Sequence, residues 1–217
     1  MDAIRVKAVA SSTRFTIPTS GIGYRLTLAG GGYTLHRVAG NKYTGGLTYT
    51  LVRSGTIQST GVFYFDGDVW VQGDYGVMVT VASAGDILIC QNLTATNLTA
   101  KKTCGLIASK NVWIPDSYPL TELPKDITIQ AALVAMTGQC GAYLSGANPR
   151  MRDSATFLGS RAYKLPCGLV MVDGSGRELY GFNNRTYTYD ANIDSNQPPM
   201  FPVINTGSLK VVTWTER

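Results

Sequence analysis

Three aspartates near the start of the central region carry the side chains best suited to chemistry. Asp66, Asp68 and Asp86 lie beside glycines in the segments Asp66-Gly67-Asp68 and Gly85-Asp86. Glycoside cleavage uses two carboxylates roughly 5 to 10 Å apart, a distance that Asp66 and Asp68 satisfy at one strand end. Carboxylate oxygens also bind calcium. The alternative is that all three form turns, because short acceptor side chains bond their own backbone there. We favour turns and expect no cofactor, with calcium as the remaining candidate.

His36 is the only histidine of the chain, and this limits the catalytic sites that the sequence can build. A Ser-His-Asp triad, a Cys-His pair or a multi-histidine metal site would depend on this residue alone. Together with the weak evidence for a carboxylate pair, the single histidine predicts that the protein is not an enzyme.

The four cysteines are candidates for disulfides. No two of them form a Cys-x-x-Cys pair, so the sequence supports neither a zinc ribbon nor a thioredoxin motif. Four thiols allow three pairings, among which the sequence does not choose. The alternative is that the thiols stay reduced and pack as small apolar side chains. The cysteines are Cys90, Cys104, Cys140 and Cys167.

The central region repeats one short pattern, in which a turn residue precedes an apolar, variable, apolar triplet. Within the strands that accompany these triplets, Val79, Leu106 and Leu133 recur at one constant spacing. Such near-periodicity is typical of a solenoid whose coils have loops of variable length. The triplets with their turn residues are Asp68-Val-Trp-Val71, Asp86-Ile-Leu-Ile89, Asn111-Val-Trp-Ile114 and Asp126-Ile-Thr-Ile129.

This pattern predicts an all-β protein built on a short right-handed parallel β-solenoid, with a β-sandwich as the alternative. Equivalent positions of a parallel coil stack about 4.8 Å apart. The first apolar positions of the triplets should therefore form one internal ladder and the third positions another. The expected ladders are Val69, Ile87, Val112 and Ile127, and Val71, Ile89, Ile114 and Ile129.

The chain is expected to form one domain over residues 1–217, because its length is typical of a single domain. Residues 1–55 read as an N-terminal β region, in which short alternating segments are separated by glycine turns. Residues 56–175 contain the coils. Residues 176–217 are rich in proline and asparagine and predict a closing arm with a last strand near 210–214, because proline removes ladder donors.

The middle residues of the triplets point outward, because side chains alternate across a strand. Trp70, Leu88 and Trp113 should then align in one external column, which we call the tryptophan column. Leaving such a column in water forgoes the free energy of burying large apolar side chains. We expect a cover, either the aromatic residues of the C-terminal arm or a partner protein or carbohydrate that stacks on the rings. The predicted interaction surface comprises Trp70, Leu88, Trp113, Tyr187, Tyr189 and Phe201.

The charge composition argues against nucleic acid as the main partner. Lys and Arg number 19 against 14 Asp and Glu, a net charge of +5, yet charged residues make up only 15% of the chain. About 25% is usual, and the basic residues form no dense run. No stretch is long and apolar enough for a transmembrane segment, and the first residues lack the apolar region of a signal peptide.

A series of motifs from about Leu47 to the end of the chain adds a family resemblance. The motifs, in order, are Gly67–Val71, Val79–Ile89, Gly105–Ile114, Ile127–Met136, Tyr187–Ile193, Pro198–Pro202 and Val211–Glu216. In this order they resemble the β-solenoid domain of bacterial type IV pilus-associated, PilX-like surface proteins. The resemblance implies a solenoid fold at a cell surface and no established catalytic residues. Members of that family usually carry an N-terminal hydrophobic anchor, which this sequence lacks.

We therefore expect a non-enzymatic structural or adhesive module of an extracellular surface assembly, associated with a type IV pilus-like filament. Its expected partners are further copies of itself or other subunits of the assembly, with carbohydrate as a further ligand. One alternative is a virion structural protein, such as a capsid decoration or tail component. A second alternative is a polysaccharide-binding or polysaccharide-active β-helix protein.

Overall fold

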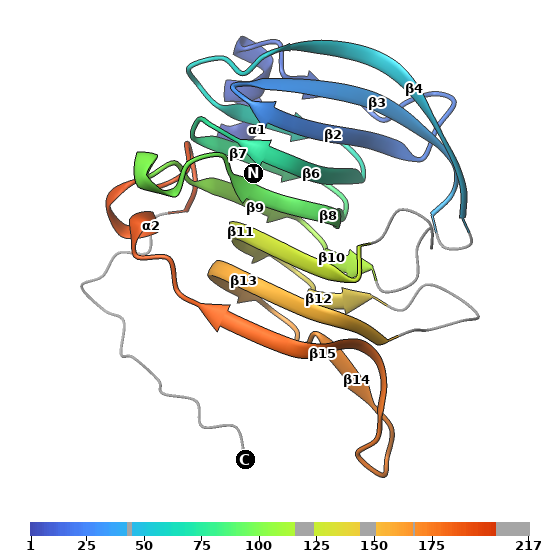
Figure 1. Cartoon of the computed structure of the whole chain (residues 1–217). Helices are drawn as coiled ribbons and strands as arrows, with labels where there is room; N and C mark the ends of the chain where they lie inside the picture. Colours follow the sequence, from blue (N-terminus) through green and yellow to red (C-terminus); the bar gives the residue numbers. More distant parts are fainter. Residues whose placement is uncertain (43–44, 116–123, 144–150, 167, 203–217) are drawn as a thin grey trace.

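A single curled sheet dominates the computed structural model of this protein (Figure 1). The structure describes all residues except 43–44, 116–123, 144–150, 167 and 203–217. Within these residues the chain is all-β, as predicted, with short helices α1 (Asp2–Ala10) and α2 (Asn192–Ser195) and a 3-10 turn at Leu98–Ala100.

The sheet has fifteen strands in the described part of the chain, and most of its pairings are parallel. The antiparallel exceptions are β2 with β3, β3 with β4, and β14 with β15. The strands are β1 (Arg14–Phe15), β2 (Gly23–Gly30), β3 (Gly32–Asn41), β4 (Gly45–Thr56), β5 (Val62–Phe65), β6 (Val69–Tyr75), β7 (Val79–Ser83), β8 (Ile87–Ala95), β9 (Cys104–Ala108), β10 (Val112–Pro115), β11 (Asp126–Ala135), β12 (Cys140–Tyr143), β13 (Met151–Tyr163), β14 (Val170–Val172) and β15 (Glu178–Thr188).

A first parallel ladder joins β1, β5, β7, β9 and the second half of β11. Leu106 pairs with Leu133, as the constant spacing predicted. On the other side Leu106 pairs with Val81, whereas Val79 pairs with Cys104. The prediction that Val79 stacks on Leu106 was therefore wrong, because Val81 takes that place. The chain between the paired residues of β7 and β9 is shorter than that between the paired residues of β9 and β11.

A second parallel ladder joins β2, β6, β8, β10 and β12. Val69 pairs with Ile87, and Ile87 pairs with Val112, as predicted. The fourth member is Cys140 and not Ile127, so that part of the prediction was wrong. The reason is that Ile127 lies in β11, which pairs with β8 only through Ile129 and Leu93 and so belongs to another ladder.

The triplet that follows Asp126 lies in a third parallel ladder. This ladder joins the second halves of β6 and β8 to the first half of β11, then to β13 and β15. Its inward column contains Leu93, Ile129, Phe157 and Tyr187. Ile129 thus stacks on Leu93 and not on the third positions of the other triplets, which corrects the second predicted ladder.

β15 also corrects the prediction of an irregular arm from residue 176. It is an eleven-residue strand that pairs in parallel with β13. The prolines that disfavour strands begin only at Pro198, after β15 has ended. The predicted last strand near 210–214 lies outside the described residues.

Gly73 allows β6 to turn from the second ladder into the third. The register of β6 against β8 shifts between Val71 and Gly73. The φ angle of Gly73 is +99°, and a Cβ atom there would overlap the carbonyl oxygen of Leu28. Only glycine combines this backbone conformation with so close an approach of another strand.

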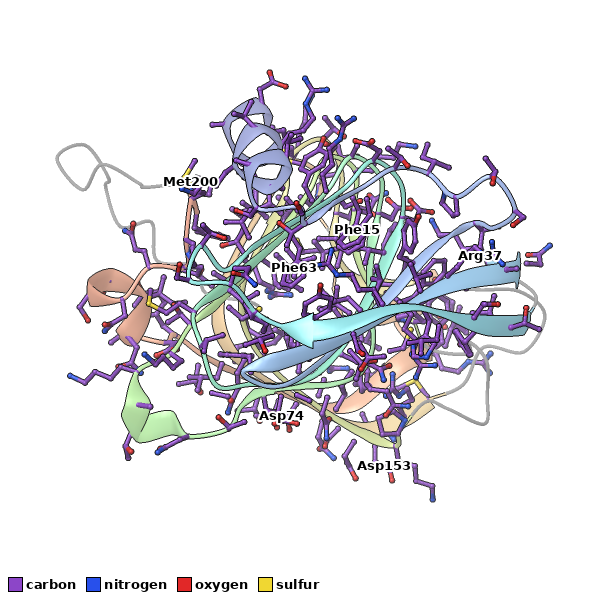
Figure 2. The ribbon with its side chains drawn as sticks, turned by 90° about the horizontal axis from the view of Figure 1, so that it is seen from above. Phe15, Arg37, Phe63, Asp74, Asp153 and Met200 are labelled. Atoms are coloured by element: carbon purple, nitrogen blue, oxygen red, sulfur yellow. The ribbon has the colours of Figure 1, made fainter. Side chains whose placement is uncertain are left out.

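The three ladders enclose one apolar core. Figure 2 looks along the stack and shows Phe15 and Phe63 inside it, with Arg37, Asp74 and Asp153 at the rim. Because side chains alternate along each strand, the inward residues of one strand stack on their equivalents in the adjacent strands of the same ladder.

Aromatic residues close the N-terminal end of the core. The Phe15 and Phe65 rings stack with centroids 5.1 Å apart, and Tyr24 packs against both. The Tyr33 ring meets Phe63 edge to face at 5.0 Å. β2, β3 and β4 continue the sheet beyond β6 at this end, so the core is covered there (Figure 1).

The tryptophan column is covered by β3 and β4. Its three members pair in register, as predicted, and Trp70 and Leu88 are buried. They pack with Val38 of β3 and Tyr49 of β4, together with the partly buried Trp113. In the described residues, Tyr187, Tyr189 and Phe201 of the C-terminal arm are not part of this cluster, which corrects their prediction as its cover. A partner that covers the column stays a prediction. The long strands β3 and β4 extend past the end of the core and reach the outer face of the second ladder.

The arm and helix α1 cover a different face, the outside of the first ladder. Ile4 and Ala8 lie one turn apart on α1 and pack against Val62 and Ile107, with Phe201 beside them. The N-terminal β region predicted over residues 1–55 thus begins with a helix. Two threonines fix the arm by donating hydrogen bonds to its carbonyl oxygens, Thr80 to Pro199 and Thr103 to Asn196.

Replacing Leu88 tests the packing beneath β3 and β4. Leu88 is 1% exposed, so Leu88→Ala should lower the free energy of unfolding by about 2–5 kcal/mol through lost burial and a cavity. Leu51→Ala is the matched control on β4, where the side chain is 60% exposed, and should cost less than about 0.5 kcal/mol. Urea denaturation measures both. Equal effects of the two changes would contradict the packing described for the tryptophan column.

Candidate functional site

The predicted turn residues form a chain of hydrogen bonds, which we call the turn ladder. Asp68 Oδ1 accepts a hydrogen bond from the backbone N–H of Asp86 at 2.8 Å. Asp86 Oδ1 accepts two from Asn111, at 3.0 Å from its backbone N–H and 2.8 Å from Nδ2. Asn111 Oδ1 accepts one from the backbone N–H of Gln139 at 3.0 Å. Each of these turn residues therefore binds the backbone at the next turn of the ladder. Asp126, at the start of β11, is not part of this ladder.

Lys42 binds both carboxylates of the turn ladder. Its Nζ lies 2.5 Å from Asp68 Oδ2 and 2.7 Å from Asp86 Oδ2, and all three side chains are largely buried. Burial alone lowers the pKa of Lys42, but its hydrogen bonds to the two aspartates and their charges outweigh burial and raise it. The carboxylates considered for calcium or glycoside cleavage thus bind a lysine of the same chain.

Asp66 is engaged separately, by Arg14. Arg14 Nη2 lies 2.8 Å from Asp66 Oδ2, and Arg14 Nε lies 3.3 Å from Oδ1, which is a bidentate pairing. Asp66 and Asp68 therefore bind different cations of the chain. In the described residues, no group of three or more His, Cys, Asp or Glu side chains is arranged to hold a metal ion.

His36 and the cysteines are placed in the sheet and the core. His36 lies in β3 between Arg25 of β2 and Leu51 of β4, so neither strand neighbour is a carboxylate or a nucleophile.

Cys90, Cys104 and Cys140 are buried, and no disulfide joins any two of these three. Burial raises the pKa of the Cys104 thiol far above its ordinary value, which makes it unreactive. Cys167 lies outside the described residues, so a disulfide that includes it stays a prediction.

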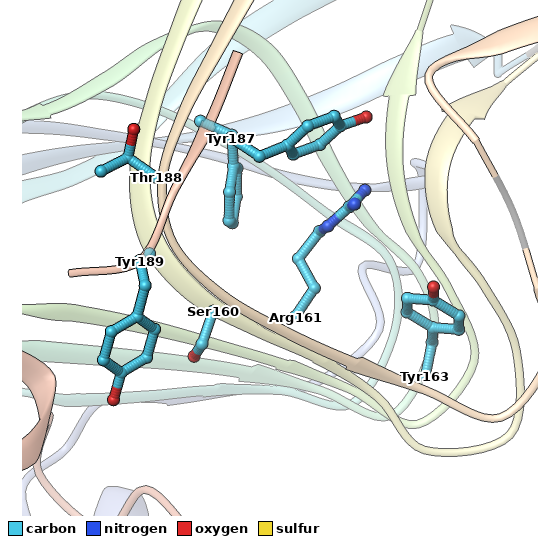
Figure 3. A pocket seen from close by; sticks show the side chains of 8 residues that line it. Ser160, Arg161, Tyr163, Tyr187, Thr188 and Tyr189 are labelled. Atoms are coloured by element: carbon cyan, nitrogen blue, oxygen red, sulfur yellow. The ribbon is translucent and has the colours of Figure 1, made fainter. Parts of the chain in front are cut away.

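A groove of about 240 Å³ lies where β13 and β15 end (Figure 3). These strands are at the end of the sheet away from β4 (Figure 1). Five of its residues come from β13 and the others from the end of β15 and the residue after it. We call it the arginine groove, after its one charged residue. It is lined by Phe157, Gly159, Ser160, Arg161, Tyr163, Tyr187, Thr188 and Tyr189.

Arg161 lies over two aromatic rings of this groove. Its guanidinium carbon is 4.4 Å from the centroid of the Tyr187 ring and 5.5 Å from that of the Phe157 ring. The centroids of these two rings are 6.4 Å apart. Cation–π contacts of this kind orient a guanidinium and leave the N–H groups at its edge available for other acceptors. Within the described part of the chain, Arg161 forms no ion pair with a carboxylate.

The strand register explains why an arginine occupies this position. Arg161 pairs with Leu133, so it follows Val81, Leu106 and Leu133 in the inward column of the first ladder. Tyr187 likewise ends the inward column of the third ladder. These columns stop here in the described structure. An arginine can therefore place its apolar stem on the core and its charged head in water.

Three tyrosines surround the guanidinium and remain partly in water. Tyr163 is 42% exposed, Tyr187 47% and Tyr189 56%. The Tyr189 hydroxyl donates a hydrogen bond to Asp194, and this bond raises the pKa of Tyr189 above its ordinary value. Figure 3 shows the Tyr163 and Tyr189 rings on opposite sides of Arg161.

The predicted interaction surface is divided among three places. Tyr187 and Tyr189 line the arginine groove, the tryptophan column lies beneath β3 and β4, and Phe201 packs beside α1. Arg161 is a further residue of the groove that the sequence pattern did not predict. Arg161 is a basic residue at a position where Leu106 and Leu133 of the adjacent strands are aliphatic. This difference could identify Arg161 only if the register of β13 against β11 were already known.

In comparisons with known proteins, no family model, curated protein or solved structure matches this chain. Among the described residues, neither helix has the length and apolar character needed to cross a membrane.

Replacing Lys42 tests the ion pairs of the turn ladder. Lys42→Met leaves two largely buried carboxylates without their cation and should lower the free energy of unfolding by about 3 kcal/mol at pH 7. Because folding raises the pKa of Lys42, its contribution is complete below pH 10.5, the ordinary pKa, and is lost as pH rises through the folded value.

Urea denaturation at pH 7 and pH 11 measures this contribution. Lys7→Met, on the exposed side of α1, is the matched control and should change stability by less than about 0.5 kcal/mol. The difference between the Lys42 variant and the wild type should be smaller at pH 11. A variant as stable as the wild type at pH 7 would show that the two ion pairs contribute nothing.

Proposed function

We propose that this chain is a non-enzymatic structural or adhesive module of an extracellular surface assembly. We further propose that residues 56–175 form a short right-handed parallel β-solenoid. The observation that carries this proposal is the repetition of parallel strands in register, in which β5, β7, β9 and β11 stack in one ladder and β6, β8, β10 and β12 in another. A stack of this kind suits a stiff scaffold whose ends present binding surfaces.

A type IV pilus-like filament is the assembly that we favour, because the motifs of the coils and the arm resemble those of pilus-associated surface proteins. The exposed end strand β4 adds physical support. In the described residues β4 pairs only with β3, and its side chains Leu51 and Val52 are 60% and 50% exposed. An open strand edge with apolar side chains favours association with another chain.

Binding of carbohydrate is a second candidate function, supported by the arginine groove. The groove offers three exposed tyrosines and a guanidinium, and no carboxylate is among its lining residues. Asp66 and Asp68, considered for glycoside cleavage, bind Arg14 and Lys42 instead. These contacts favour binding of a sugar without its cleavage.

Hydrolysis assays test the non-enzymatic part of the proposal. The full chain is expected to release no reducing ends from pectin and no soluble fragments from peptidoglycan. The Asp66→Asn and Asp68→Asn variants should behave like the wild type. Reproducible hydrolysis by the wild type that either substitution abolishes would contradict the proposal.

Fractionation of the source cells tests the surface assembly. The chain is expected to copurify with filaments sheared from the cell surface and to be degraded by protease added to intact cells. A photo-crosslinking residue at Leu51 of β4 should give adducts with filament subunits or a second copy. The same residue at Ser175, an exposed loop position, should give fewer adducts. A chain found only in the protease-protected fraction would overturn the proposal.

A further inference from the structure

We propose that the arginine groove binds an acidic carbohydrate, with the carboxylate of the sugar on Arg161 and the sugar rings against Tyr163, Tyr187 and Tyr189. This inference rests on the adhesive function proposed above and names the chemical class of its ligand. It is argued from four features: the position of the groove, the guanidinium, the tyrosines and the size of the site.

The two ends of the stack differ in how the core is closed. At the N-terminal end, Tyr24 and Tyr33 pack on phenylalanines, and β2, β3 and β4 extend the sheet over them. At the opposite end, the inward columns finish in Arg161 and Tyr187, which no further described coil covers. Exposed aromatic surface of this kind marks a place where another molecule binds.

Arg161 gives this surface one fixed positive charge. The rings of Phe157 and Tyr187 orient the guanidinium, which restricts the rotamers that binding would otherwise have to fix. A guanidinium held by its face presents its N–H edge, and that edge matches the two oxygens of a carboxylate. Since no described carboxylate pairs with Arg161, an anionic ligand supplies the complementary charge.

The tyrosines favour a sugar as the carrier of that carboxylate. A sugar ring has an apolar C–H face, which packs on an aromatic ring, and hydroxyl groups at its edge, which need polar partners. The groove offers both, because exposed tyrosine rings alternate there with the hydroxyl-bearing side chains of Ser160 and Thr188. Asp194 accepts a hydrogen bond from the Tyr189 hydroxyl, and this bond restricts the position of that ring.

The size and charge of the groove limit the ligand further. A volume of about 240 Å³ is below the range of roughly 300–1,000 Å³ typical of drug-sized ligands, so the groove encloses only part of a short oligosaccharide. Nucleic acid requires a stripe of several basic residues along a phosphate backbone, whereas Arg161 is the only cation among the lining residues.

Titration calorimetry with matched sugars tests the inference. The acidic probes are trigalacturonic acid and 3′-sialyllactose, and their neutral partners are the methyl ester of trigalacturonic acid and lactose. We expect at least one acidic probe to bind at least tenfold more tightly than its neutral partner. Raising the salt concentration should weaken that binding, because the charged pair lies near the surface.

Four variants of the full chain, with a fifth as control, separate the contribution of the guanidinium from that of the tyrosine ring. Arg161→Gln should weaken binding of the acidic probe at least tenfold, and Arg161→Lys should restore part of it, since an ammonium cannot form the bidentate pair. Tyr189→Ala should weaken binding several-fold, whereas Tyr189→Phe keeps the ring and should stay within about twofold. Arg177→Gln, at an arginine side chain that is 77% exposed outside the groove, is the matched control and should bind like the wild type.

Several results would overturn the inference. They are the absence of binding by both acidic probes, equal binding of an acidic probe and its neutral partner, and unchanged binding by a folded Arg161→Gln variant. Binding of a single-stranded oligonucleotide as tight as that of the sugars would also overturn it. Thermal melting confirms that each variant is folded. Copurification with surface filaments does not depend on this groove, so the two proposals can fail independently.

Discussion

Parallel pairing in register is the constraint on which the rest of this structure depends. Adjacent strands of a ladder lie about 4.8 Å apart, so each inward side chain packs on its equivalents in the neighbouring strands. The columns therefore need apolar residues of similar size, such as Val69, Ile87 and Val112 in the second ladder. A slip of one residue would turn a whole column from the core to the solvent. Each strand of a ladder therefore needs suitable inward residues of its own. One residue of the wrong size disturbs the packing of the two residues beside it in the column.

Columns of this kind must also end, and the two ends are built differently. The N-terminal end uses aromatic rings under an antiparallel extension of the sheet, whose strands β3 and β4 are long enough to cover the tryptophan column as well. The other end places a charged and several amphipathic side chains at the last inward positions. Arg161 and Tyr187 satisfy the core with their apolar parts and the solvent with their polar parts. The surface with the most binding chemistry is therefore a consequence of where the stacking stops.

The aspartates of the turn ladder were candidates for calcium binding or glycoside cleavage, but their contacts stabilise the fold. Asp68 and Asp86 each accept a backbone hydrogen bond from the next turn with one carboxylate oxygen and bind Lys42 with the other. A carboxylate with both oxygens bonded in this way has little capacity left for a metal ion or a substrate. The same contacts hold Lys42, which directly follows β3, against the turns that precede β6 and β8. They thereby help to hold β3 and β4 over the tryptophan column.

The sequence alone determined the features that depend on local pattern. Alternation of apolar residues predicted the all-β class and most strands, and the shared turn residues predicted that Trp70, Leu88 and Trp113 align. The same pattern placed Ile127 in the wrong ladder, because the residues of a triplet do not reveal which strand they pair with. Only the tertiary structure decided that β3 and β4 cover the tryptophan column and that Arg161 meets Tyr187. Both results depend on the lengths of turns and on contacts between distant segments, which local periodicity does not encode.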